Sequence, residues 1–100
     1  TVRSIAKAVC GHFGISKIDL VSSRRGLRLA RSRQLVMYIA REMTLCSYPE
    51  MGRLLGNRDH STCVHGATKI KARLDFDDKL RADVDAIRAV LVPAEQPMTG

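Results

Sequence analysis

Residues 47–70 read SYPEMGRLLGNRDHSTCVHGATKI and contain two helix signals separated by a tight turn. Ser47 stands at a cap position, Pro49 falls in the first turn, and Glu50 follows the serine by three residues. This spacing is a capping box, in which each end residue satisfies a free backbone N–H of the other. The stretch therefore predicts a short helix that runs to about Leu55.

The second half of the same stretch predicts a second helix. Gly56 and Asn57 are typical of residues that end a helix, and Asp59 is a good cap for a new one over about 59–74. Two helices joined by a turn containing glycine, the second polar at its N-terminal end, are typical of a helix-turn-helix.

The rest of the chain is also helical in its apolar spacing, and no strand pattern interrupts it. The predicted class is all-α, with five to six helices around the helix-turn-helix. Arg24 and Arg25 fall in a polar loop at residues 22–26. The further predicted helices cover residues 2–13, 16–21, 29–46 and 75–92.

Three details of these helices are specific enough to check. Asp75 is expected to cap the last helix, and Pro93 to stop it. Residues 93–100 have nothing to bury, so we expect a folded domain over 1–92 and a flexible tail over 93–100. On the helix over 29–46 the expected faces are as follows: Leu35, Val36, Ile39, Met43 and Leu45 buried, and Arg33, Arg41 and Glu42 outward.

Composition fits one domain of 100 residues, 45% of them hydrophobic. No apolar run approaches the roughly 18 residues of a membrane span, and residues 1–20 lack the unbroken apolar segment of a signal peptide. We expect a cytoplasmic, nucleoid-associated protein. Cys10, Cys46 and Cys63 are odd in number and form no CxxC pair, which favours reduced thiols. His60 and Cys63 alone do not fill a tetrahedral site, so no metal and no cofactor is expected.

The charge of the chain is unevenly distributed. Residues 1–74 carry fourteen Lys or Arg against four Asp or Glu, whereas residues 75–100 carry three against six. Five arginines fall within ten residues, from Arg24 to Arg33, with no acidic residue among them. Such a cluster repels itself, and a phosphate backbone is the obvious compensating partner. An acidic membrane surface is the less favoured alternative that this pattern leaves open.

The start of the second helix has the residue types that read DNA bases. An aspartate accepts from cytosine, an arginine pairs with guanine, and Ser, Thr and His donate or accept at several base edges. Asp59, His60, Ser61 and Thr62 occupy the first turn, which enters the major groove in a helix-turn-helix, and Arg58 precedes it. Each alone has a simpler explanation as a cap or a solvated side chain. Together, in a basic chain, they favour sequence-specific DNA binding. Arg24 or Arg25 could reach a minor groove.

The sequence GNRDHSTCVHGATKI resembles the signature of the C-terminal DNA-binding domain of the bacterial replication initiator DnaA. The resemblance extends over residues 1–90 and includes ARSRQLVMYIAREMT and SYPEMGRLLG. It implies a Trp-repressor-like fold that binds short asymmetric boxes in double-stranded origin DNA. The implied base contacts are Arg25 in the minor groove and Arg58, Asp59, His60 and Ser61 in the major groove. The implied backbone contacts are Arg24, Arg33, Gln34, Arg41, Tyr48, Pro49, Thr62, His65 and Lys69.

This sequence departs from the family pattern at several positions. Ser61 stands where threonine is usual, Cys63 replaces an aliphatic residue, Gly66 replaces Ala or Ser, and Ser32 replaces a frequent proline. A glycine inside a helix costs about 1 kcal/mol relative to alanine. These changes suggest a diverged copy with a different preferred box. No GxxxxGK[ST] phosphate loop occurs, so the resemblance does not extend to an ATPase.

Two other classes of function compete with DNA reading. The fold could serve as a regulatory or protein-interaction module that competes at initiator boxes or acts as a transcription regulator. Its partner would be a replication or regulatory protein, docked on the acidic last helix. An enzyme is not expected, because Asp59, His60 and Ser61 are helix neighbours that point in different directions and cannot form a catalytic relay. The sequence separates neither an excised domain from a stand-alone protein nor an activator from a repressor.

Overall fold

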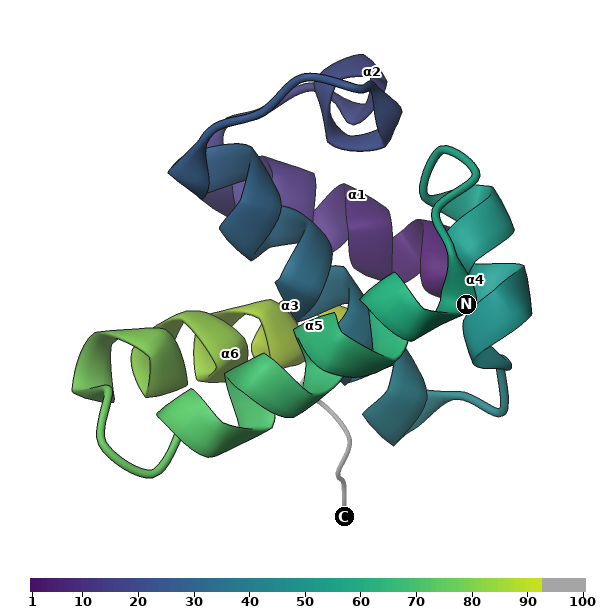
Figure 1. The fold of residues 1–100 in the computed structure, drawn as a ribbon. Helices are drawn as coiled ribbons and strands as arrows, with labels where there is room; N and C mark the ends of the chain where they lie inside the picture. The colour runs from purple at the N-terminus through teal and green to yellow at the C-terminus, as the bar shows by residue number, and fades with distance from the viewer. Residues whose placement is uncertain (93–100) are drawn as a thin grey trace, which may run out of the picture.

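The computed structural model describes residues 1–92, which form six helices and no strand (Figure 1). The all-α prediction is therefore confirmed. No helix in this described part is long and apolar enough to cross a membrane. The helices are α1 (Val2–Phe13), α2 (Lys17–Val21), α3 (Leu27–Met43), α4 (Tyr48–Leu54), α5 (His60–Arg73) and α6 (Asp78–Leu91). The predicted tail over 93–100 lies outside the described residues.

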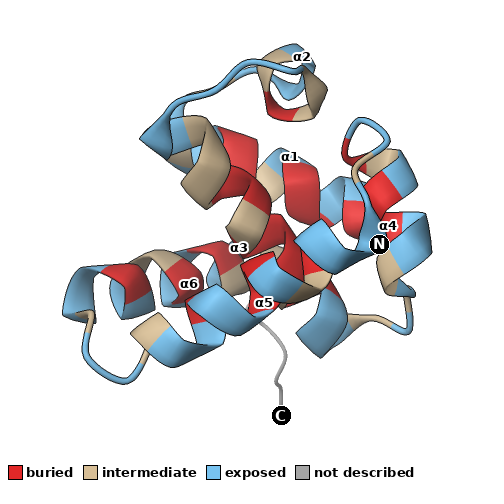
Figure 2. Cartoon of the chain, in the orientation of Figure 1, coloured by how far each residue is buried: buried red, intermediate tan, exposed pale blue. Residues whose placement is uncertain are grey.

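Helix α3 is the central element of the fold. It packs against α5 on one side and α1 on the other, and α6 packs on α1. Figure 1 shows α5 crossing in front of α3 while α1 lies behind it. Leu35, Val36 and Ile39 are fully buried in α3, and Figure 2 shows buried residues concentrated where these helices meet. Because the face of α5 that meets α3 is apolar, its opposite face is left for solvent.

Local caps define most helix ends as the sequence predicts. Gly14 adopts the left-handed conformation at the end of α1, with φ of 66°. The Ser16 hydroxyl accepts from the Asp19 amide at the start of α2, at 3.0 Å. The Ser47 hydroxyl accepts from the Glu50 amide at 3.3 Å, which is the capping interaction expected for α4.

The cap of the last helix differs from the prediction. Asp77, not Asp75, begins α6, and its carboxylate accepts from the Leu80 amide at 3.0 Å and from the Arg73 guanidinium at 3.0 Å. The amide hydrogen bond and then the arginine lower the pKa of Asp77. The connection between α5 and α6 is therefore two residues longer than expected. Asp77 fixes its end, because its carboxylate bonds to Arg73 of α5 and to the Leu80 amide of α6.

The end of α3 also differs from the prediction. The helix stops at Met43, because Thr44 is extended, with φ of −134°, and its hydroxyl donates back to the Ala40 carbonyl at 2.6 Å. The helical phase is lost at that point. The expectation that Met43 and Leu45 are buried is wrong: Leu45 lies beyond the end of α3 and is fully exposed, and Met43, the last residue of the helix, is 39% exposed.

The turn between α4 and α5 depends on two glycines. The Arg58 amide donates to the Gly52 carbonyl at 2.8 Å, and a Cβ at Gly52 would lie 2.0 Å from the Arg58 carbonyl oxygen. Gly56 has φ of +90°, and Asn57 also has positive φ, at 61°. Met51 and Leu55 of this unit are buried against the rest of the core. The helix-turn-helix prediction is thus confirmed in its geometry.

Candidate nucleic-acid interface

The first turn of α5 projects a group of exposed polar side chains. Asp59 caps the helix, with its carboxylate accepting from the Ser61 amide at 3.1 Å. Its other oxygen lies 3.7 Å from His60 Nδ1, and both side chains are more than half exposed. Ser61 and Thr62 are exposed as well. The cap uses part of one carboxylate, so most of the hydrogen-bonding capacity of this turn faces solvent.

The opposite face of α5 holds this turn in place. Cys63, Ala67 and Ile70 are buried and pack on the core, at a spacing of three and four residues that puts them on one helix face. Gly66 is buried too, and a Cβ there would lie 2.4 Å from the Met37 sulfur of α3. The missing side chain at Gly66 therefore lets α5 approach α3 closely.

Arg24 and Arg25 are exposed on the loop between α2 and α3, as predicted. The Arg24 guanidinium lies 3.5 Å from the Asp19 carboxylate with 72% of its side chain exposed. Within residues 1–92 the structure records no ion pair for Arg25. Gly26, with φ of +132°, ends the loop at the start of α3. Both arginines are thus available to a ligand. Arg25 is the more available of the two, because Arg24 lies near the Asp19 carboxylate.

Arg33 does not face outward, so that expectation is wrong. Its side chain is only 7% exposed. Nε donates to the Leu20 carbonyl at 2.7 Å, and Nη2 donates to the carbonyls of Asp19 at 3.1 Å and Ser22 at 2.9 Å. These carbonyls belong to the end of α2, where a helix leaves its oxygens unsatisfied and favours a cation. The sequence could not reveal this role, because nothing in its periodicity shows that α2 packs there.

Arg58 lies apart from the exposed turn that follows it. Its guanidinium folds back and donates to the Ser22 carbonyl at 2.8 Å and to the Leu55 carbonyl. Its side chain is half-buried, whereas Asp59 and His60 are exposed. Burial and the nearby charge of Arg58 both lower the pKa of Arg33. The structure thus brings Arg33 and Arg58 together beside the exposed first turn of α5, with both guanidiniums bonded to the Ser22 carbonyl.

A groove of about 420 Å³ runs between α3 and α5. Five of the predicted backbone contacts line it, together with Arg58, and they come from both helices: Arg33, Gln34, Thr62, His65 and Lys69. His65 and Lys69 are exposed and four residues apart, so they share one helix face. The groove gathers these side chains next to the exposed first turn of α5.

A second group of predicted contacts lies at the start of α4. The Arg41 guanidinium lies 4.8 Å from the centre of the Tyr48 ring and donates to the Cys46 carbonyl at 3.3 Å. Arg41 and Tyr48 line a groove of about 360 Å³ together with Thr68 and Lys71 of α5. Stacking on the ring keeps the exposed arginine in a fixed position.

Thr68 and Lys71 line this groove but were not among the predicted contacts. Both are exposed, and they lie three residues apart on the face of α5 that leads from Lys69 toward Tyr48. Helical spacing from the predicted first turn could have found them. Pro49 is exposed in the first turn of α4, as expected for a residue near the groove.

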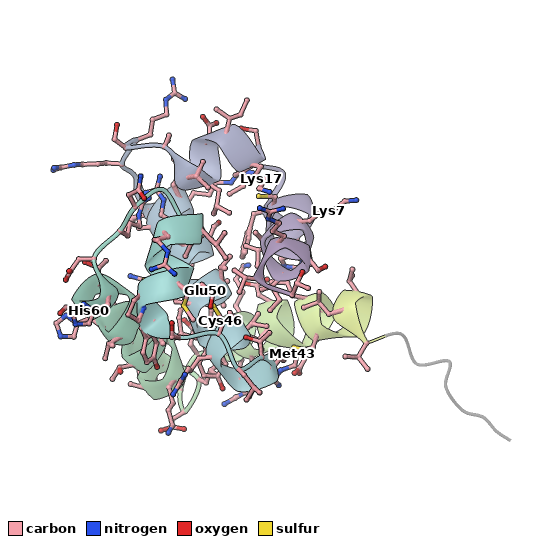
Figure 3. The ribbon with its side chains drawn as sticks, turned by 90° about the vertical axis from the view of Figure 1, so that its right-hand side faces the viewer. Lys7, Lys17, Met43, Cys46, Glu50 and His60 are labelled. Carbon is pink, nitrogen blue, oxygen red and sulfur yellow. The ribbon has the colours of Figure 1, made fainter. Side chains whose placement is uncertain are left out.

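Not every basic residue joins this interface. Figure 3 shows His60 on the left side of the domain and Lys7 of α1 on the right side. The total charge therefore overstates the charge at the candidate interface, and position along the fold decides which residues belong to it.

The acidic last helix has largely satisfied its charges internally. Asp78 pairs with Arg81, and Asp83 accepts from His12 Nε2 at 2.8 Å. Arg88 binds the Glu42 carboxylate of α3 through two nitrogens, with Nε at 2.9 Å. This helix is therefore fastened to α1 and α3 by its own ion pairs, which weakens its case as a docking surface.

The three cysteines are free, with Cys10 and Cys63 buried and Cys46 half-buried. Burial raises the pKa of the Cys63 thiol, so the thiol form is favoured. In the part of the chain that the structure describes, His, Cys, Asp and Glu side chains do not gather in groups of three that could hold a metal.

Comparison with known proteins agrees with this geometry. A model of the family described as "Bacterial dnaA protein helix-turn-helix" matches residues 2–70. The chromosomal replication initiator protein DnaA of Sphingopyxis alaskensis is 44% identical over 91 residues, and that of Geobacter sp. is 43% identical over 91 residues. The initiator of Gluconobacter oxydans is 38% identical over the same length. Each match covers 91% of this chain and 19% or 20% of the relative, so the chain spans about a fifth of these proteins.

Proposed function

This chain belongs to the bacterial DnaA helix-turn-helix family, and from that premise we propose that it binds double-stranded DNA sequence-specifically. The DNA sites would resemble the boxes that initiators bind, and the role would lie in replication initiation or its control. The observation that carries the proposal is the first turn of α5, where Asp59, His60 and Ser61 are exposed on a rigid, close-packed helix.

In the proposed complex this turn enters the major groove. His60 and Ser61 donate to or accept from base edges, and Asp59 accepts from a cytosine amino group with the oxygen that does not cap the helix. Arg25, with Arg24 beside it, enters the adjacent minor groove from the loop. Asp59, unlike a purely cationic surface, repels phosphate, so its place at the centre of the interface favours base recognition over non-specific binding.

Residues in and beside the two grooves contact the DNA backbone in the proposed complex. Gln34, Thr62, His65 and Lys69 contact one strand along the groove between α3 and α5. Arg41, Tyr48 and Pro49 contact it at the start of α4. Arg33 and Arg58 are omitted from the direct contacts, because their guanidiniums bond to backbone carbonyls of the protein.

Selection of bound sites from a random duplex library tests the proposal. The wild-type domain should enrich one short asymmetric site, and the preference should persist in fluorescence anisotropy titrations against a scrambled duplex. Enrichment of no site, with equal affinity for both duplexes, would refute sequence-specific binding.

Two substitutions test the base-reading turn within that assay. Asp59→Asn keeps a helix cap but removes the anion, and His60→Ala removes the imidazole. Each should reduce discrimination against one base pair by about 1–3 kcal/mol while non-specific affinity is retained. Asp75→Asn removes the same charge from the exposed connection before α6 and is the matched control. Unchanged discrimination in both variants would contradict the assignment.

A further inference from the structure

The main-chain carbonyl of Ser22 accepts hydrogen bonds from two different guanidiniums. Arg33 reaches it from α3 at 2.9 Å, and Arg58 reaches it from the turn before α5 at 2.8 Å. Ser22 is the residue at which α2 ends and the loop carrying Arg24 and Arg25 begins. One carbonyl oxygen thus joins three separate parts of the chain.

The Ser22 side chain extends the same junction into the loop. Its hydroxyl donates to the Asp19 carbonyl at 2.7 Å and accepts from the Arg24 amide at 3.1 Å. The loop backbone is therefore bonded to Ser22 immediately before Arg25. A shift of Ser22 would move the base of this loop with it.

A direct backbone contact ties the same parts together independently of the arginines. A Cβ at Gly56 would lie 2.0 Å from the Val21 carbonyl oxygen, so the turn of the helix-turn-helix packs directly against the end of α2. Arg58 also donates to the Leu55 carbonyl at that turn. The end of α2 and the turn before α5 thus form one rigid junction.

We infer that Arg33 and Arg58 are positioning residues that fix the minor-groove loop relative to the recognition helix α5. The inference rests on the proposed function, because it assigns them to the geometry of that DNA complex. Neither touches DNA in this assignment. They hold the distance between the base pairs that Arg25 reads and those that Asp59 to Ser61 read.

The chemistry of the junction explains why both residues are arginines. Arg33 donates to three carbonyl oxygens in different directions, which a planar guanidinium with five N–H groups can do. A lysine has one nitrogen on a flexible stem and cannot span the same three acceptors. A residue that contacts only phosphate, in contrast, needs a positive charge, which lysine supplies.

A fixed loop matters because an arginine on a loose loop must be ordered at each binding event. That ordering reduces affinity, and a preorganised side chain avoids it. Loss of the junction should therefore mimic loss of Arg25 itself, without affecting the base pairs read by the first turn of α5.

Arg33→Lys tests whether Arg33 acts through its three hydrogen bonds or through its charge alone. Arg3→Lys, at an exposed position of α1 outside both grooves of the interface, is the control. Sites are selected from a random duplex library by wild type, Arg25→Ala, Arg33→Lys and the double variant. We expect Arg33→Lys to lose preference at the base pairs that Arg25→Ala identifies, by about tenfold, the worth of one base contact. The double variant should lose no more than Arg25→Ala alone, and Arg3→Lys should keep the preference.

The opposite pattern would overturn the inference. If Arg33 contacts phosphate, Arg33→Lys should keep the site preference as Arg3→Lys does, and any loss of affinity should be uniform over all sites and add to that of Arg25→Ala. Arg58→Met gives a second test: a base-reading Arg58 predicts relaxed preference at one major-groove base pair, whereas a positioning Arg58 predicts relaxed preference at the Arg25 base pairs.

Amide hydrogen exchange measures the junction without DNA, so the inference and the proposed function can fail separately. The Ser22 and Arg24 amides should exchange about tenfold faster in Arg33→Lys than in Arg3→Lys, the loss expected for a hydrogen bond from a charged donor. Thermal unfolding followed by circular dichroism verifies that each variant is folded at the assay temperature. Unchanged exchange at both amides would refute the junction even if the wild type binds its site, whereas faster exchange with no site preference would refute only the proposed function.

Discussion

The two charged ends of this domain differ in what their side chains bond to. At the acidic end, Asp78, Asp83 and Arg88 have partners within the protein. At the basic end, His60, Lys69 and Arg25 are exposed, and the structure records no carboxylate partner within residues 1–92 for Lys69 or Arg25. The comparison teaches that net charge alone does not locate an interface. An interface is located by the charged side chains that have no partner within the protein.

The exposed basic end depends on the turn between α4 and α5, which holds the first turn of α5 in position. Gly52→Ala should disrupt this turn. A Cβ at Gly52 would lie 2.0 Å from the Arg58 carbonyl oxygen and 3.1 Å from its carbonyl carbon, and this obstruction is backbone, which cannot turn aside as a flexible side chain can. We expect unfolding free energy to fall by about 3 kcal/mol or more, with loss of site-specific binding. Urea unfolding and anisotropy measure both.

Gly11→Ala provides the control for that substitution. Gly11 lies within α1, and no heavy atom would approach its Cβ within 4 Å. Alanine there should raise stability by about 0.5–1 kcal/mol through helix propensity. A Gly52→Ala protein as stable as wild type would show that the turn can yield, and would remove the structural basis of the contrast.

A pair of lysines sharpens the contrast directly. Lys69 lines the groove between α3 and α5, whereas Lys79 pairs with Asp83 at 3.4 Å. Lys69→Gln should reduce the slope of log affinity against log salt by about 1 and weaken binding to all sequences, because one phosphate contact is lost. Lys79→Gln removes the same charge and should leave the slope unchanged. Equal effects of the two would mean that net charge, not position, governs binding.

The contact between Gly66 and Met37 tests how α5 is held beneath its exposed turn. Because a Cβ at Gly66 would lie 2.4 Å from the Met37 sulfur, Gly66→Ala should destabilise the wild type by about 1 kcal/mol. In a Met37→Ala background the obstruction is gone, and the same change should stabilise by up to about 1 kcal/mol through helix propensity. A double-mutant cycle of urea unfolding measures this change of sign. Additive effects would show that the two residues do not interact.

The helix-turn-helix could be predicted because its signals are local. Ser47, Pro49 and Asp59 act on the first turn that follows them, and such signals survive whatever packs around them. The exposure of Asp59 to Thr62 followed from the same helix phase. Membership in the family is now established, whereas the individual contacts of these residues with DNA remain predictions.

Features that depend on distant packing could not be predicted. Arg33 looks like an outward residue in its own helix, and only the docking of α2 turns it into a buried donor. Leu45 fits the apolar phase of α3, yet the extended Thr44 ends that phase one residue earlier. Asp75 and Asp77 are equally good caps by type, and the position of Arg73 at the end of α5 selects the second.

The smallest predicted effect concerns Asp77, which lies in the connection between α5 and α6, where the basic part of the chain meets the acidic part. Its pKa is lowered in the folded protein by the Leu80 amide and Arg73, so its anion contributes stability that is present above the pKa of the unfolded state. That contribution is lost as pH falls through the lower, folded-state pKa. Asp77→Asn keeps a capping oxygen but cannot titrate. The stability difference between wild type and Asp77→Asn in urea unfolding should therefore shrink as pH falls from about 6 to below about 3.8, the usual range of an aspartate.

Asp75→Asn removes the same charge without touching the cap and is the control. If the stability difference does not depend on pH, then α6 is held by its packing on α1. In that case the ionic bridge from Arg73 to Asp77 does not contribute to the free energy of unfolding.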